Sequence, residues 1–237
     1  MSAEAPAWPV MSIAEAHARL TAPGQRFEIE EMPIRGILTK VWKNAPPTLR
    51  DVFLNARGFH DREFLVYDDE RATYEAFARA TLALAHQLQA DGVRKGDRIA
   101  VIMRNLPEWP VAFFAGILAG AIVTPLNAWW TGAELEYGLA DSGTKVAIVD
   151  DERLSRIAPY LDTLGDLRRV YVSRLTEPWA HPKVARLEAV IGAVNGWQAL
   201  PDRPLPDIEL GPEDDATILY TSGTTGKPKG ALGTHRN

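Results

Sequence analysis

The chain has 237 residues, of which 46% are hydrophobic and 24% are charged, and its formal net charge is −5. This composition is typical of a soluble globular protein, and the negative charge does not favour nucleic-acid binding. There is no cysteine, which excludes disulfide bonds and thiolate metal sites. The first ten residues lack a basic region followed by an apolar run, so we expect no signal peptide and a cytoplasmic location.

The first sixty residues (1–60) are predicted to form a helical arm. Ser12 stands where an N-cap is needed and Glu15 follows three residues later, which predicts a capping box at the start of a short helix. Residues 21–47 contain several prolines and show no clean periodicity, so no regular element is predicted there. Thr48 is predicted to cap a second helix.

Between residues 61 and 194 the sequence alternates short apolar runs with helical periodicity. The predicted strands are 64–67, 99–103, 122–126, 146–149 and 170–172. The predicted helices are 74–92, 107–119, 132–141 and 152–164. Strands separated by helices favour an α/β fold whose mostly parallel sheet is covered by helices on both faces.

One stretch of this region also fits a membrane span. No charged residue lies between Glu108 and Glu134, and residues 109–126 are long enough to cross a bilayer. Pro110 falls in the first turn of the expected helix, and Gly120 falls where that helix should end. These residues favour a buried helix followed by a buried strand, with the membrane span as the alternative.

The last part of the chain is predicted to contain a linker (195–213) and a strand–loop–strand unit (214–237) whose loop binds phosphate. Glycines let backbone N–H groups approach an anion, while hydroxyl groups and lysines add donors and positive charge. A Walker P-loop is excluded, because Thr221 stands where that motif has its first glycine and Pro228 follows the lysine. The predicted phosphate-binding residues are Thr221, Ser222, Gly223, Thr224, Thr225, Gly226, Lys227, Lys229 and Gly230.

This loop, with Ile218–Tyr220 before it, resembles the AMP-binding signature of the adenylate-forming superfamily. Pro125–Asn127 is more similar to acyl-CoA synthetases of that superfamily than to adenylation domains of peptide synthetases. The resemblance extends from about Tyr67 to Asn237. Other segments that resemble superfamily motifs are Thr73–Glu75, Gly92–Ala100, Asn105–Glu108, Gly116–Asn127, Glu134–Leu135 and Asp141–Gly143.

The resemblance implies an enzyme that activates a carboxylic acid, expected to be a fatty acid, with Mg-ATP and transfers the acyl group to CoA. It implies that the loop holds the β- and γ-phosphates of ATP, that Thr221 helps to place magnesium, and that Lys229 rather than Lys227 makes the main charge contact. Other adenylate-forming enzymes remain alternatives: an aryl-CoA ligase, a fatty acyl-AMP ligase or a peptide-synthetase adenylation domain. A non-catalytic nucleotide-binding or folding module is the alternative from another class.

The chain ends seven residues beyond this loop. The resemblance implies that the adenine-binding segment, the acid that holds magnesium and the catalytic lysine lie further on in such enzymes. We therefore expect an incomplete N-terminal part of the adenylate-forming fold, with a truncated second subdomain, no assignable catalytic residue and no activity of this chain alone.

Three further positions are candidates for a function. Trp129 and Trp130 follow a predicted strand at the edge where parallel sheets bind ligands, although packing is the alternative. Asp214 and Asp215 form a possible metal site, with solvated acids as the alternative. His235 is expected to have a structural role at the start of a helix rather than a catalytic one. The other histidines show no metal-ligand spacing.

Overall fold

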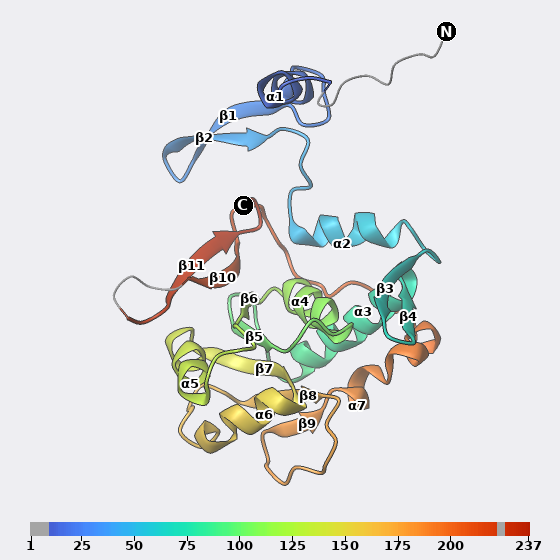
Figure 1. Ribbon diagram of the computed structural model, residues 1–237, viewed down its shortest axis with the longest axis vertical. Helices are drawn as coiled ribbons and strands as arrows, with labels where there is room; N and C mark the ends of the chain where they lie inside the picture. The colour runs from blue at the N-terminus through green and yellow to red at the C-terminus, as the bar shows by residue number, and fades with distance from the viewer. Residues whose placement is uncertain (1–9, 222–225) are drawn as a thin grey trace. The chain divides into compact units, whose positions relative to one another are not determined.

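A computed structural model describes residues 10–221 and 226–237 of the protein (Figure 1). The chain falls into two compact units, Met1–Pro46 and Pro47–Asn237, which are described separately below. The division of the chain at residues 60, 194 and 213 stays a prediction.

The first unit begins with helix α1 (Ile13–Thr21). The Ser12 hydroxyl accepts a hydrogen bond from the Glu15 N–H at 3.1 Å, as expected of an N-cap. The Glu15 carboxylate instead pairs with Arg19 one turn further on, at 2.9 Å. The predicted capping box is therefore wrong in its second half, because an i,i+4 ion pair holds the acid along the helix rather than at its start.

A β-hairpin follows α1, where the sequence predicted no regular element. Strands β1 (Ile29–Ile34) and β2 (Ile37–Trp42) pair in antiparallel register. They are joined by Arg35 and Gly36, which have φ angles of 48° and 83°. Positive φ at both central residues is the geometry of a tight type I′ turn. The prediction failed because the turn lacks the usual Asn-Gly or Asp-Gly pair and because Pro33 lies within a strand that has a free edge.

The second unit is built on a seven-stranded sheet in the order β11-β10-β6-β5-β7-β8-β9. Every neighbouring pair is parallel except β10 and β11, which form an antiparallel hairpin. This confirms the predicted mostly parallel sheet of an α/β fold. The strands are β5 (Arg98–Ile102), β6 (Ile122–Pro125), β7 (Thr144–Asp150), β8 (Arg169–Ser173), β9 (Val184–Arg186), β10 (Asp215–Thr221) and β11 (Lys229–Thr234).

Helices cover both faces of this sheet, also as predicted (Figure 1). Helices α2 (Leu49–Arg57), α3 (Tyr74–Ala90) and α4 (Glu108–Leu118) pack on one face, and α5 (Gly132–Asp141) and α6 (Asp151–Ile157) pack on the other. Strand β5 shows the alternation that produces the two cores. Its Ile99 and Val101 join the first core, and its Ala100 and Ile102 join the second.

Glycines have two different roles in these layers. Helix α3 ends at Ala90, and Gly92, the predicted stop, has a φ of 85° while the Val93 N–H bonds to the Leu88 carbonyl at 3.0 Å. A positive φ just beyond the last helical residue is typical of a Schellman stop. Within α4, a Cβ added to Gly116 would lie 2.6 Å from the Val123 side chain. Only glycine lets this helix approach β6 so closely.

The apolar stretch that also fitted a membrane span forms α4, a turn at Gly120 and β6. Helix α4 has 11 residues, and Gly120 has a φ of 77°. In the described part of the chain, no helix is long and apolar enough to cross a membrane. The prediction of a buried helix followed by a buried strand is confirmed for these residues.

Several short elements were missed by the sequence analysis. Strand β3 (Glu63–Tyr67) was predicted, but its antiparallel partner β4 (Glu70–Thr73) was not. After β9 the chain forms the short helix α7 (Glu188–Ile191) and the 3₁₀ helix η2 (Val194–Ala199). Trp197 of η2 is 0% exposed, whereas residues 195, 196, 198 and 199 of the predicted linker are exposed, so the segment lies at the surface and is anchored in the core by one side chain.

Candidate functional site

A cavity of about 920 Å³ lies at the carboxyl ends of the parallel strands. Its walls come from the segments that directly follow β5, β6, β7 and β8, and from the end of β10. In open parallel sheets this is the edge where ligands bind, because the loops that leave neighbouring strands meet there. The lining residues used below are Arg104, Trp129, Asp150, Arg153 and Tyr220.

The predicted phosphate loop leaves the sheet at this same edge. Strand β10 is parallel to β6, with Thr217 opposite Val123, so Thr221 at its end lies on the carboxyl side. The central loop residues, Ser222, Gly223, Thr224 and Thr225, lie outside the described residues. Their predicted phosphate contacts therefore stay predictions.

The described loop residues have the geometry of a tight return between two strands. The Thr221 hydroxyl donates to the Lys229 carbonyl at 3.4 Å, which closes the hairpin. Gly226 has a φ of 96°, a conformation that favours glycine. Gly230 is needed for packing, because an added Cβ would lie 2.7 Å from Ile218. A phosphate contact by Gly230 remains a prediction beside this structural role.

The two lysines of the loop differ in their surroundings. The Lys227 ammonium lies over the ring of Tyr137, 5.0 Å from its centroid, which is a cation–π contact. Lys229 is the first residue of β11, and both lysines are exposed. The prediction that Lys229 makes the main charge contact with phosphate is compatible with this exposure, and it stays a prediction.

Helix α5 contacts the chain on both sides of the loop, which the sequence analysis did not foresee. The Tyr220 hydroxyl donates to the Asp141 carboxylate at 2.6 Å, and the Tyr137 hydroxyl donates to the Pro228 carbonyl at 3.3 Å. Burial, followed by the hydrogen bond and charge of Asp141, raises the pKa of Tyr220 well above its usual range. The phenol therefore stays protonated and remains a hydrogen-bond donor at physiological pH.

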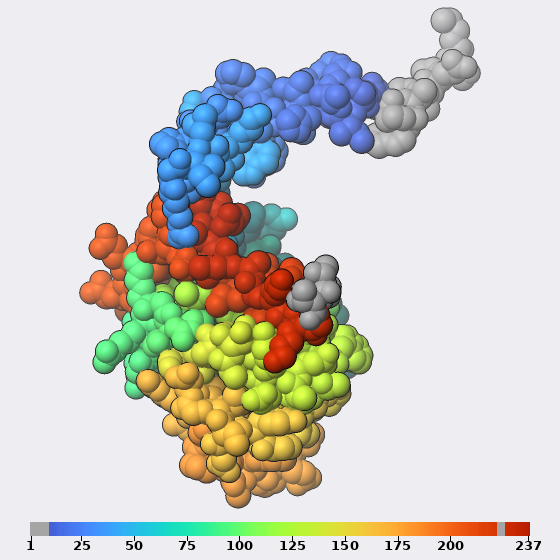
Figure 2. Space-filling view, turned by 90° about the vertical axis from the view of Figure 1, so that its left-hand side faces the viewer, coloured from blue at the N-terminus to red at the C-terminus, as the bar shows by residue number. Residues whose placement is uncertain are grey.

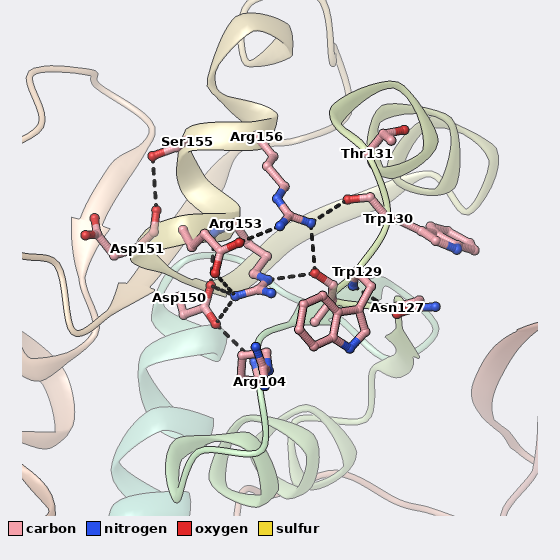
Figure 3. Close-up of polar contacts among 12 residues, drawn as sticks. Arg104, Asn127, Trp129, Trp130, Thr131, Asp150, Asp151, Arg153, Ser155 and Arg156 are labelled. Carbon is pink, nitrogen blue, oxygen red and sulfur yellow. Dashed lines mark hydrogen bonds and ion pairs between the residues drawn. The ribbon is translucent and has the colours of Figure 1, made fainter.

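Two arginines fix the segment after β6, as Figure 3 shows. Arg153 of α6 is 1% exposed, and its Nε donates to the Ala128 carbonyl at 2.8 Å. Arg156, one turn along, donates to the same carbonyl at 3.1 Å and to the Trp130 carbonyl at 2.8 Å. Backbone carbonyls that receive charged donors are held strongly. The two tryptophans therefore project from a segment whose backbone is fixed.

Asp150 joins this segment to the end of β5. Its carboxylate pairs with Arg153 at 3.1 Å and accepts the backbone N–H of Arg104 at 3.0 Å. The Arg104 guanidinium in turn lies over the ring of Trp129, 4.1 Å from its centroid. The wall of the cavity is thus one connected set of contacts between β5, β6 and β7.

The two adjacent tryptophans have different roles. Trp129 is 65% exposed and lines the cavity, so a contact with a ligand remains a prediction for it. Trp130 packs edge-on against Tyr220, with ring centroids 5.9 Å apart. For Trp130 the packing alternative therefore accounts for the observed position.

The residues considered for metal binding have protein partners. The Asp214 carboxylate accepts the Gly211 N–H and pairs with Lys95, each at 2.7 Å. These contacts, first the Gly211 N–H and then Lys95, lower the pKa of Asp214. In residues 10–221 and 226–237, no three His, Cys, Asp or Glu side chains gather as a metal site.

His235 has the structural role that the sequence predicted, but at a different helix. Its Nδ1 accepts the Leu49 N–H at 3.2 Å. Leu49 is the first residue of α2, whose N–H has no partner within its own helix. Burial lowers the pKa of His235, which favours the neutral imidazole that can accept this bond.

The sheet, the cavity and the phosphate loop all lie within a region that matches a known enzyme family. The sequence matches the family of AMP-binding enzymes over residues 52–237. The chain therefore belongs to the AMP-binding enzyme family, as the resemblance of the loop implied. The match covers most of the second unit, including the sheet, the cavity and the phosphate loop.

Related proteins include several CoA ligases. The chain is 31% identical over 236 residues to a long-chain-fatty-acid–CoA ligase of Escherichia coli O157:H7, covering 84% of this chain and 41% of that protein. It is 36% identical over 165 residues to a feruloyl-CoA synthase of an Amycolatopsis species, covering 70% of this chain and 28% of the relative. The chain thus spans less than half the length of either relative.

A solved structure shows the same fold. The crystal structure of a protein described as a long-chain-fatty-acid CoA ligase from Rhodopseudomonas palustris superposes with a TM-score of 0.66 at 26% sequence identity. The superposition covers 79% of this chain and 44% of that protein. The chain therefore has the fold found in the N-terminal part of adenylate-forming enzymes.

Proposed function

We propose that this chain is part of an AMP-forming acyl-CoA synthetase that acts on a fatty acid. The observation that carries the proposal is the position of the phosphate loop. It leaves β10 at the carboxyl edge of the sheet, where Tyr220 also lines the cavity of about 920 Å³. A polyphosphate held by the loop would therefore lie beside a space large enough for a second substrate.

The proposed reaction has two steps. A carboxylate oxygen of the acid attacks the α-phosphorus of ATP, the bond to the bridging oxygen breaks, and pyrophosphate leaves. The thiolate of CoA then attacks the acyl carbonyl carbon and AMP leaves. Donors aimed at the β- and γ-phosphates would stabilise the charge that develops on the leaving pyrophosphate. Lys229, which is exposed where the chain passes from the loop into β11, would supply one such positive charge.

Magnesium belongs to this proposal. Mg²⁺ prefers oxygen ligands and commonly bridges phosphate oxygens. Thr221 places a hydroxyl at the carboxyl edge, where its only described acceptor is the Lys229 carbonyl at 3.4 Å. Such a long bond is easily exchanged, so the chemistry of Thr221 fits a magnesium ligand.

The cytoplasmic location expected from the sequence stays a prediction.

The choice of a fatty acid rests on two supports: the similarity of Pro125–Asn127 to acyl-CoA synthetases, and the relative named a long-chain-fatty-acid–CoA ligase. The feruloyl-CoA synthase among the relatives keeps an aryl acid as the alternative.

Nucleotide binding is the property to test first. We expect titration calorimetry to show that the chain binds Mg-ATP and pyrophosphate. Replacement of Lys229 by Ala should weaken the binding by about 1.5–3 kcal/mol, the contribution of one charged hydrogen bond. Lys40→Ala is the matched control, because Lys40 is an exposed strand lysine of the first unit. Equal affinities of wild type and Lys229→Ala would contradict the assignment of the loop.

A further inference from the structure

Helix α5 has a fixed position beside the phosphate loop. Its first turn is closed by a capping box in which the Thr131 N–H donates to Glu134 at 2.8 Å. On its inner face, a Cβ added to Gly138 would lie only 3.0 Å from Leu126 and 3.1 Å from Trp130. The absence of a side chain at Gly138 thus brings the helix close to the segment after β6. Figure 2 shows the chain of β10 and β11, in red, lying directly against the yellow-green chain that contains α5.

The last turn of α5 contacts Tyr220, the residue that directly precedes the loop. Tyr220 directly precedes Thr221, and its hydroxyl donates to Asp141 at 2.6 Å. A short bond to a carboxylate is among the stronger hydrogen bonds in proteins. The edge-on contact with Trp130 restricts the same ring from a second side. The position of the loop's first end is therefore set by α5 and by the segment packed against it.

The same turn of α5 contacts the chain that leaves the loop. Tyr137 lies four residues before Asp141, so the two side chains share one face of the helix. The Tyr137 hydroxyl is 3.3 Å from the Pro228 carbonyl and 3.4 Å from the Asp141 carboxylate. Its ring lies beneath the Lys227 ammonium. One helical turn thus reaches both ends of the loop.

We propose that Tyr137 and Asp141 are positioning residues that fix the two ends of the phosphate loop before a polyphosphate binds. The proposal rests on the proposed function and adds to it two residues on a distant helix. Holding both ends of a short loop reduces the conformational entropy that binding must otherwise remove. Preorganised donors also stabilise developing charge without a cost of reorganisation.

The contact of Lys227 with Tyr137 adds a second element to this arrangement. The ring of Tyr137 keeps the Lys227 ammonium next to the loop. A cation–π contact at an exposed site is weaker than a hydrogen bond between charged groups. A phosphate oxygen can displace this contact, because it binds the ammonium more strongly. Lys227 would then exchange the ring of Tyr137 for phosphate when the complex forms.

The test removes a single hydroxyl group or a single charge and leaves the rings in place. Tyr220→Phe and Asp141→Asn weaken the same hydrogen bond from its two sides. Each should raise the dissociation constant for inorganic pyrophosphate, measured by titration calorimetry, about three- to tenfold, since the first end of the loop is then held less firmly before binding. Tyr137→Phe should have a smaller effect, about two- to threefold, because its bonds are longer. Tyr74→Phe on α3 is the control for loss of a hydroxyl, and Glu136→Gln is the control for a change of charge on α5 itself.

Hydrogen exchange shows whether the ends of the loop are released, and pyrophosphate affinity is the readout that a purely structural role would not move. The amides of residues 220, 221, 226, 227 and 229 should exchange faster in Tyr220→Phe and Tyr137→Phe, while those of β5 keep the wild-type rate. Unchanged pyrophosphate affinity of both phenylalanine variants would overturn the proposal, whatever their exchange rates. A lower unfolding temperature with wild-type affinity would also overturn it, because the two residues would then only stabilise the fold.

Pyrophosphate binding by the wild-type chain distinguishes a failure of the positioning role from a failure of the proposed function. If the wild type does not bind pyrophosphate, the proposed function fails. The exchange rates at the ends of the loop then still decide whether α5 fixes them. If the wild type binds and both phenylalanine variants bind equally well, the loop is assigned correctly and only the positioning role is wrong.

Discussion

Strand β5 and the β10–β11 hairpin belong to one sheet but are held in different ways. Val101 and Ile102 of β5 are buried between two layers of helices, whereas Leu219 and Leu232 of the hairpin are 52% and 53% exposed. The centre of the sheet is stabilised by apolar burial on both faces. The hairpin adds polar contacts near its ends, made by Asp141 and His235, to the burial of Ala216. The comparison separates the part that stabilises the fold from the part that carries the phosphate loop.

The largest loss of stability should come from a substitution in the buried core. Trp197→Ala in η2 should lower the free energy of unfolding by about 3–5 kcal/mol, because a large side chain is removed from a closed core. Chemical denaturation followed by circular dichroism measures this change. Trp179, which is 40% exposed, provides the matched control, and Trp179→Ala should cost far less. Equal effects of the two variants would mean that η2 is not part of the core.

The contact between α4 and β6 should be the next most sensitive. Gly116→Ala places a Cβ at 2.6 Å from Val123, and such overpacking costs about 1–3 kcal/mol. A Gly→Ala change at an open helical site would instead raise the free energy of unfolding by up to about 1 kcal/mol. The sign of the change in stability therefore shows whether α4 and β6 are in close contact. Gly165→Ala is the control, because a Cβ added there would meet no neighbouring group within 4 Å. Stabilisation by Gly116→Ala in the same denaturation assay would contradict the close approach.

A smaller effect is expected from the titration of His235 at the far end of the hairpin. Its pKa in the folded chain lies below the ordinary value of 6.5, so the unfolded chain binds a proton more readily. The stability that this group contributes is therefore fully present above about pH 6.5 and is lost as the pH falls through the folded pKa. Protonation removes the acceptor of the Leu49 N–H and places a positive charge at a helix N-terminus.

Unfolding of the wild type and of His235→Gln, measured between pH 5 and 8, checks this expectation. The stability difference between the two should shrink as the pH falls. His17→Gln, which changes an exposed histidine of the first unit, is the matched control. A difference that stays constant over the whole range would show that His235 does not titrate in this way.

The smallest effect should come from the exposed face of the hairpin. Leu232→Thr should change the free energy of unfolding by no more than about 0.5 kcal/mol, as is usual for surface substitutions. The same substitution at the buried Leu82 of α3, measured alongside, should cost several times more. A loss of more than about 1 kcal/mol at Leu232 would mean that the hairpin is held by apolar packing, and the contrast with β5 would then fail.

The elements that the sequence predicted well are those whose surroundings leave a strong local pattern. Strand β5 and helix α4 are buried almost throughout, so continuous apolar runs marked them. The β1–β2 hairpin and η2 leave no such pattern. The hairpin has exposed residues on both strands, and the burial of Trp197 depends on its packing against the α3 side of the core. These elements are defined by tertiary contacts rather than by periodicity.

The candidate site was predictable only in its local part. The phosphate loop is a continuous motif, so donors, glycines and lysines could be recognised together. Asp141 lies 79 positions before Tyr220, and no local feature of α5 marks it as a partner of the loop. Arg153 would read as a surface residue of an amphipathic helix, yet it is buried because three backbone and carboxylate acceptors surround it. Such contacts follow from the order of the strands, which periodicity alone does not determine.

The antiparallel direction of β11 has a mechanical consequence. The strand begins beside the phosphate loop and ends near the start of α2, where His235 follows it. Its six residues span about 20 Å at the usual rise per residue. The chain is held by Tyr137 at Pro228, just before the strand, and by Leu49 at His235, just after it, so the edge strand is fixed at both ends along its length. Loss of either contact would therefore release one end of the strand while the other end stays held.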